Sequence, residues 1–128
     1  MKKDFQKWHK KKEFLQDEKA RPFFHEREVW FCSLGENVGF EQDGRGEEFL
    51  RPVVVIKKFN QEVCCGVPLT RNQKNGQYYF SFSLDEETST AILLQIRLID
   101  SKRLQYKLGD LSEADFIEMR KRLTQLLA

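Results

Sequence analysis

Apolar and polar residues alternate in short runs from residue 27 onward, and turn-forming residues separate these runs, a pattern typical of β-strands. The strands predicted on this basis cover residues 28–34, 51–59, 62–70, 77–84, 90–96 and 104–108. Pro52 is expected at the beginning of its strand, where no ladder donor is needed. The run at 90–96 is more continuously apolar, which predicts a central strand.

Two further segments have the spacing of helices instead. Near the C-terminus, Ser112 and Asp115 approximate a capping box, and apolar residues follow at helical spacing. These residues are Phe116, Met119, Leu123 and Leu126. An appended amphipathic helix is expected over residues 3–19, where an apolar stripe recurs at spacings of three and seven. The stripe comprises Phe5, Trp8 and Leu15.

These elements predict a mainly β, α+β fold. About six short strands closed by one helix indicate a small, strongly bent antiparallel sheet or barrel, against which the C-terminal helix packs. Residues 35–50 contain four glycines and are predicted to form a long loop, a kind of segment that is often functional. We expect two units: a basic helix with its linker over residues 1–26, and a barrel domain over residues 27–128.

Composition and charge narrow the class of protein. Of the 128 residues, 40% are hydrophobic and 33% charged. No apolar run approaches the roughly 20 residues that cross a bilayer, and no secretory signal is evident, so a cytoplasmic protein without a membrane span is expected. The net charge is only +2, yet residues 1–12 hold six lysines against the single acid Asp4. This basic segment permits nucleic-acid binding, and the simpler alternative is a solvated helix face.

The sequence suggests neither a metal nor a cofactor. Cys32, Cys64 and Cys65 have no zinc-type spacing and form no even disulfide framework, so we expect reduced packing cysteines. The Rossmann glycine fingerprint, the P-loop, the nucleophile elbow and the zinc-binding helix motif are all absent from the sequence. The common nucleotide-binding and metallohydrolase classes therefore have no support.

Four segments, in the order in which they occur, resemble the PemK/MazF family of toxins from toxin–antitoxin operons. They read EVWFCSLGENVGFEQDG, RPVVVI, GVPLT and QIRLIDSKRL, and an acid-capped helix follows them. The resemblance covers residues 27–128 and implies a plicated SH3-like barrel and metal-independent cleavage of single-stranded RNA at short sequences. It also implies inhibition by a cognate antitoxin with an acidic, flexible segment, and a homodimer with residues 90–97 and Ile99 near the interface.

The resemblance implies roles for particular residues. Arg51 and Thr70 match the pair that acts on the scissile phosphate. The RNA-binding residues implied by the polar end of the long loop and by the QIR segment are Glu41, Gln42, Gln95 and Arg97. Phe40 is a further RNA-binding candidate, because an apolar residue among Gly, Glu and Gln has no evident core to enter.

Because RNA supplies its own nucleophile, Arg51 and Thr70 need only stabilise the reacting phosphate. RNA carries its own nucleophile, the 2′-hydroxyl, which attacks the adjacent phosphorus. The guanidinium of Arg51 offers a planar fork of donors to the phosphate oxygens, and Thr70 offers one hydrogen bond. Both residues could instead have a purely structural role. Arg51 would then form a salt bridge with Glu41 or Glu48, and Thr70 would be a turn residue.

Other features leave the choice of function open. Phe80 and Phe82 are expected in the core rather than as a stacking surface for bases. His9 and His25 are weak candidates for the proton carrier, which stays unassigned. The stretch 43–50 is longer and more acidic than in typical family members, so sequence specificity does not transfer. The rival interpretation is a non-catalytic binding or inhibitory protein on the same fold, such as a topoisomerase poison or a DNA-binding module.

Overall fold

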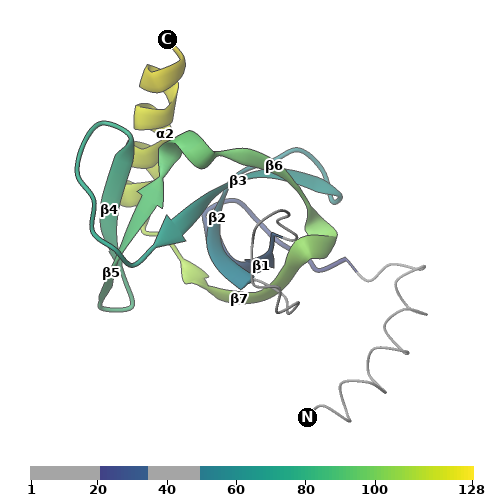
Figure 1. The fold of residues 1–128 in the computed structure, drawn as a ribbon. Coiled ribbons are helices and arrows are strands. Elements are labelled where there is room, and N and C mark those ends of the chain that lie inside the picture. Colours follow the sequence, from purple (N-terminus) through teal and green to yellow (C-terminus); the bar gives the residue numbers. More distant parts are fainter. Residues whose placement is uncertain (1–20, 35–49) are drawn as a thin grey trace, which may run out of the picture.

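The computed structural model describes residues 21–34 and 50–128 (Figure 1). The predicted N-terminal helix and nearly all of the predicted long loop lie outside the described residues. The elements follow one another as β1 (Glu28–Ser33), β2 (Leu50–Lys58), β3 (Val63–Thr70), β4 (Tyr79–Leu84), β5 (Glu87–Ile92), the 3-10 helix η1 (Leu93–Gln95), β6 (Arg97–Asp100), the 3-10 helix η2 (Ser101–Arg103), β7 (Leu104–Asp110) and α2 (Glu113–Leu127).

The seven strands form one antiparallel sheet in the order β4-β5-β3-β2-β1-β7, and β6 pairs with β3. Strands β6, β3, β2, β1 and β7 curl into a ring, in which η2 connects β6 to β7 (Figure 1). No hydrogen-bonded ladder joins β6 to β7 in the described part of the chain. The predicted mainly β fold, with a strongly bent antiparallel sheet and a C-terminal helix, is confirmed.

The sheet buries side chains on both faces. The concave face, inside the curl, holds an inner core, whose members are Phe24, Trp30, Cys32, Val53, Val55, Cys64, Ile99 and Leu104. The opposite face packs against α2 and forms a helix-side core that includes Met119. Because successive residues of a strand point to opposite faces, β2 supplies Val53 and Val55 to one core and Val54 and Ile56 to the other. The apolar run of β2 is continuous because both of its faces are buried.

A glycine allows the strands to approach closely inside the curl. A Cβ added at Gly66 would lie 2.5 Å from Val53 Cγ1 and 2.9 Å from Ile99 Cδ1, inside the usual contact distance of carbon atoms. Irregular register between β1 and β7, and between β2 and β3, adds to the bend, because a bulge increases the local twist of a strand.

The three cysteines are free, as expected. Cys32 and Cys64 are buried in the inner core. Burial raises the pKa of the Cys64 thiol to about 12. This thiol is therefore protonated at physiological pH and serves as a small apolar packing group.

Helix α2 begins as the sequence predicts. The Ser112 hydroxyl accepts a hydrogen bond from the Asp115 backbone N–H at 3.1 Å, which satisfies one of the free donors of the first turn. The predicted apolar stripe of this helix faces the sheet, where Met119 and Leu123 are buried and Phe116 and Leu126 pack against them. None of the helices described is long and apolar enough to cross a membrane.

The prediction of one strand over residues 90–96 is wrong in its second half, which forms η1. Both β5 and β6 pair with β3, but Leu69 lies opposite Ala91 whereas Gly66 lies opposite Arg97, so the register shifts by three residues. The three residues of η1 take up this shift. Strand β6 was missed, because an apolar run does not show where a strand leaves its partner and returns to it in a new register.

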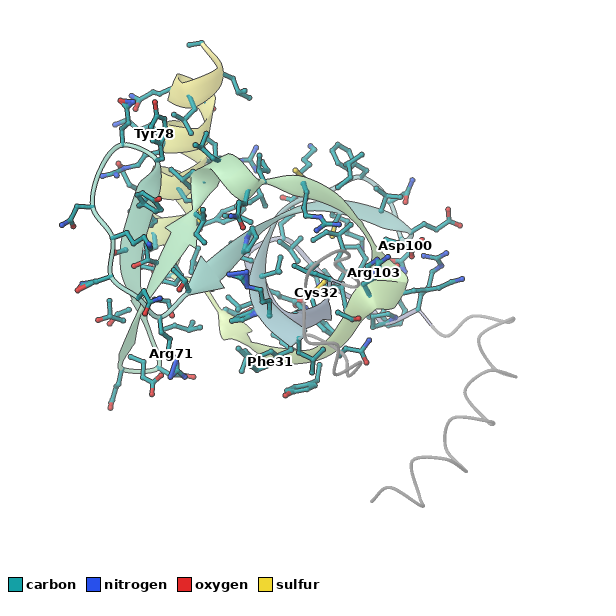
Figure 2. All side chains as sticks on the ribbon, viewed as in Figure 1. Phe31, Cys32, Arg71, Tyr78, Asp100 and Arg103 are labelled. Carbon is teal, nitrogen blue, oxygen red and sulfur yellow. The ribbon has the colours of Figure 1, made fainter. Side chains whose placement is uncertain are left out.

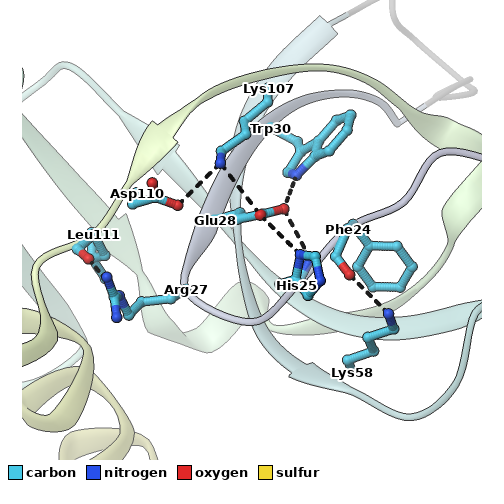
Figure 3. A network of polar contacts seen from close by, with 9 residues as sticks. All are labelled: Phe24, His25, Arg27, Glu28, Trp30, Lys58, Lys107, Asp110 and Leu111. Carbon is cyan, nitrogen blue, oxygen red and sulfur yellow. Dashed lines mark hydrogen bonds and ion pairs between the residues drawn. The ribbon is translucent and has the colours of Figure 1, made fainter.

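A buried carboxylate organises the beginning of β1 (Figure 3). Glu28 accepts hydrogen bonds at 2.9 Å from the His25 backbone N–H and from the indole N–H of Trp30, and Lys107 Nζ lies 3.3 Å from its second oxygen. Burial by itself raises the pKa of Glu28, but these hydrogen bonds outweigh it and hold the pKa below the ordinary value of 4.5. The ionised form is thus the one that the fold stabilises.

Replacing this carboxylate should reduce the acid sensitivity of the protein. Because the pKa of Glu28 is lower in the folded state, its contribution to stability is present above the unfolded-state pKa and is lost as pH falls through the folded-state pKa. We expect Glu28→Gln to lower the free energy of unfolding by about 1–3 kcal/mol at pH 7 and by less at pH 3. Urea unfolding between pH 3 and 7 measures this. Asp110→Asn, which alters an exposed partner of the same Lys107, should change stability by less than about 1 kcal/mol. Equal losses for Glu28→Gln at both pH values would contradict the assignment.

Candidate functional site

The two residues predicted to act on phosphate come from neighbouring strand ends. Arg51 is the second residue of β2, and Thr70 is the last residue of β3. The strands run antiparallel with Val53 opposite Pro68, so two residues further along, the beginning of β2 meets the end of β3. Both side chains are half-buried. The fold therefore brings together two residues that are 19 positions apart in the sequence.

Arg51 and Thr70 also belong to the concave face. Arg51 lies opposite Cys32 of β1, a member of the inner core, and directly opposed residues of a sheet project from the same face. On β3, Thr70 is four residues after Gly66, where an added Cβ would point at the inner core, and residues an even number apart share a face. Both side chains therefore lie at one open end of the curl.

The Thr70 hydroxyl is held in place by its neighbours. Its oxygen accepts a hydrogen bond from the Asn72 backbone N–H at 3.2 Å, which leaves the hydroxyl proton for another acceptor. Thr90 of β5 lies opposite Thr70 and is fully buried. Its hydroxyl lies 2.8 Å from that of Ser81. The end of β3 is therefore lined by oriented hydroxyl groups, and the turn role of Thr70 is compatible with donation to a ligand.

Two further guanidinium groups lie near this end of the curl. Burial raises the pKa of the Cys32 thiol to about 11, and the charges of Arg103 and Arg97 act in the opposite direction, so both lie within electrostatic range of this residue. Arg97 begins β6 and is two residues before Ile99 of the inner core, so it also belongs to the concave face. Arg51 lies opposite Cys32 on β2, so this part of β1 has one arginine on a neighbouring strand and two more within electrostatic range.

The other predicted RNA-binding residues stay predictions. Gln95 is exposed in η1, which contacts β3, the strand that ends at Thr70. Phe40, Glu41 and Gln42 lie outside the described residues, as do both acids proposed as salt-bridge partners of Arg51. Arg103 was missed by the sequence analysis, although it lies within the segment QIRLIDSKRL, because a charged pair such as Lys-Arg is typical of any exposed surface.

The structure also shows where Phe80, Phe82 and His25 lie. Phe80 and Phe82 are buried in the helix-side core with their ring centroids 5.9 Å apart, so the prediction that they fill the core is confirmed. His25 lies at the opposite end of β1 from Cys32, 3.2 Å from the Glu28 carboxylate. Within residues 21–34 and 50–128, no three His, Cys, Asp or Glu side chains gather closely enough to hold a metal ion.

Comparison with known proteins identifies the family. Residues 25–127 match the model of the PemK-like, MazF-like toxins of type II toxin–antitoxin systems. The chain belongs to this family of toxins. No curated protein was found to match the sequence of this toxin.

Solved structures share the fold of this toxin at low sequence identity. An endoribonuclease in complex with its cognate antitoxin, from a mycobacterial species, has 15% identity and a TM-score of 0.63, over 83% of this chain and 94% of that one. The Mycobacterium tuberculosis toxin MazF-mt6 has 12% identity and a TM-score of 0.60, over 79% and 96%. A MazE-MazF structure from Deinococcus radiodurans has 16% identity and a TM-score of 0.63, over 83% and 97%. At these identities the likeness shows the fold alone.

Proposed function

We propose that this toxin is a sequence-selective endoribonuclease that cleaves single-stranded RNA without a metal, by attack of the RNA's own 2′-hydroxyl. The observation that carries the proposal is the pairing of Arg51 with Thr70 at adjacent strand ends on the concave face. A guanidinium and a hydroxyl at adjacent positions of one face are donors that can stabilise a pentacovalent phosphorane. The names endoribonuclease and toxin MazF, which similar structures carry, support it.

The two residues would act at different oxygens of the reacting phosphate. As the 2′-oxygen attacks, negative charge builds on the non-bridging oxygens, and the permanently charged fork of Arg51 stabilises it. The Thr70 hydroxyl, which is oriented by Asn72, donates one further hydrogen bond. The 2′-hydroxyl loses its proton to a base as it attacks, and the 5′-oxygen takes up a proton from an acid as its bond to phosphorus breaks, two roles to which no residue is assigned. The products are a cyclic 2′,3′-phosphate and a 5′-hydroxyl.

The proposal includes a cognate antitoxin, since structures of similar proteins contain one. The concave face of this toxin is basic at its open end, where Arg51, Arg97 and Arg103 lie near Cys32. An acidic, flexible segment matches this charge and would fold on binding. We propose that such a segment occupies the place of RNA and so inhibits the toxin.

The proposal also includes a homodimer. Three apolar side chains between the beginning of η1 and the middle of β6 are exposed in the single chain, namely Leu94, Ile96 and Leu98. Apolar residues so closely spaced on the surface are typical of an interface, and two-fold dimers are the commonest assembly. Ile99, which is expected near the interface, follows Leu98 directly and is itself buried in the inner core. The dimer contact is therefore assigned to residues 94–98.

One incubation tests the proposed activity. Purified toxin is mixed with long, mixed-sequence RNA in EDTA, and the ends of the fragments are mapped. We expect cleavage at a limited set of sequences, with cyclic 2′,3′-phosphate and 5′-hydroxyl ends, because the nucleophile belongs to the RNA. Intact RNA at high protein concentration, or cleavage that requires added magnesium, would contradict the proposal. Intact RNA together with tight binding of a protein target would favour the non-catalytic alternative.

A further inference from the structure

Arg103 joins the end of β1 to the beginning of β7. Its Nη1 donates a hydrogen bond to the Ser33 carbonyl at 2.9 Å, and Ser33 is the last residue of β1. The side chain is half-buried, and Figure 2 shows it beside Cys32. Leu104, the next residue, lies opposite Cys32. The guanidinium is thus fixed at the point where the chain leaves β1.

This position places Arg103 on the other side of β1 from Arg51. Cys32 has Arg51 opposite it on β2 and Leu104 opposite it on β7. Neighbouring strands are about 4.8 Å apart, so about 10 Å separates the backbone of β2 from that of β7, and less where the sheet curls. An arginine side chain is long enough to span much of this distance from each side. The two arginines therefore lie on either side of β1 at the level of Cys32.

The chemistry of the guanidinium allows two simultaneous roles. It carries five N–H donors in a rigid plane, and the bond to Ser33 uses one of them. The remaining donors keep a fixed orientation because that bond and the partial burial hold the plane. A lysine ammonium in the same place would be a point charge without this fork.

We propose that Arg103 is a second phosphate-binding arginine of this site, which holds the Ser33 carbonyl with one N–H and the phosphate next to the scissile one with the others. The inference rests on the proposed function and extends it, because it assigns the neighbouring phosphate to a residue outside the Arg51–Thr70 pair. Arg103 helps to bind the RNA and to position it along the site, whereas Arg51 stabilises the reacting phosphate. Loss of Arg103 therefore weakens RNA binding more than it slows the bound reaction.

The test is the salt dependence of RNA binding. A pool of 2′-O-methyl RNA 20-mers, which cannot be cleaved by this route, is titrated with toxin at several salt concentrations. For single strands each phosphate contact contributes about 0.7 to the slope of log affinity against log salt. Arg103→Gln should lower this slope by about 0.7, which corresponds to about fivefold weaker binding at 0.1 M salt. Lys121→Gln removes an exposed charge from α2, on the other side of the sheet, and should leave the slope unchanged.

A second variant covers the case in which Arg103→Gln fails to fold. Arg103→Lys keeps the charge and so the slope, but one ammonium does not hold the carbonyl and the phosphate together, so affinity should fall at least about twofold. An unchanged slope in folded Arg103→Gln, or wild-type affinity in Arg103→Lys, overturns the role of Arg103 alone. Wild-type toxin whose RNA affinity is independent of salt overturns the proposed function as well.

Discussion

Arg51→Ala is expected to lower the rate of RNA cleavage by about 100-fold or more. The contact removed is a charge-assisted one that strengthens as the phosphorane forms, and removal of a single oxyanion donor has an effect of this size. Folding should change little, because Arg51 is half-buried at a strand end and belongs to neither core. Single-turnover cleavage of an RNA that contains one mapped site measures the rate, and thermal unfolding measures stability.

Two companion variants separate the site from a general loss of positive charge. Thr70→Val keeps the shape of the side chain and removes one neutral hydrogen bond, so a loss of about tenfold is expected. Arg71→Ala removes an exposed arginine that pairs with Glu87 at 3.3 Å, one residue beyond the site, and should retain a rate within about threefold of wild type. If Arg51→Ala cleaves at the wild-type rate, the assignment of the site is wrong.

Leu98→Glu is expected to convert the protein from a dimer to a monomer and to abolish most of its cleavage activity. Leu98 is 63% exposed in the single chain, next to Arg97 of the concave face. A carboxylate placed in an apolar interface would have to lose its hydration without a partner, which is strongly unfavourable. Light scattering should give twice the chain mass of 15.3 kDa for the wild type and 15.3 kDa for the variant.

Helix α2 offers a matched control for this substitution. Ile117 is 62% exposed and belongs to α2, outside the assigned interface of residues 94–98, so Ile117→Glu makes the same chemical change at an equally exposed position. It should remain dimeric and active. A wild-type protein with the mass of one chain at micromolar concentration, or a Leu98→Glu variant that stays dimeric, would contradict the assigned interface.

The local pattern of apolar and polar residues was sufficient to predict most helices and strands. The Ser112 cap and the stripe that follows it predicted α2, because capping and helical periodicity depend on residues only a few positions apart. Strands β1 to β3 appeared within one or two residues of their observed bounds for the same reason. Strand β5 begins earlier than predicted, since the turn before it uses Asp85 and Glu86 at positive φ instead of the glycine or asparagine that usually marks such a turn.

The candidate site was predicted only in part. Arg51 and Thr70 came from a resemblance of ordered motifs, and the antiparallel register then placed them together. Arg103 has no local signal, because its role depends on a hydrogen bond to Ser33, which is 70 positions away. The lysine-rich N-terminal segment, with Phe40, Glu41 and Gln42, lies outside the described residues and stays a prediction.

The sequence by itself determined the family, the residue types available for the chemistry, and the kind and order of the elements apart from η1, β6 and η2, since these depend on composition and on neighbours along the chain. Only the tertiary structure decided the three-residue register shift at η1. It also decided the curl that Gly66 permits and the grouping of Arg51, Arg97 and Arg103 around Cys32. The physical reason is that register and curvature arise from packing between strands, where burial on two faces and the lack of one side chain determine which distant residues meet.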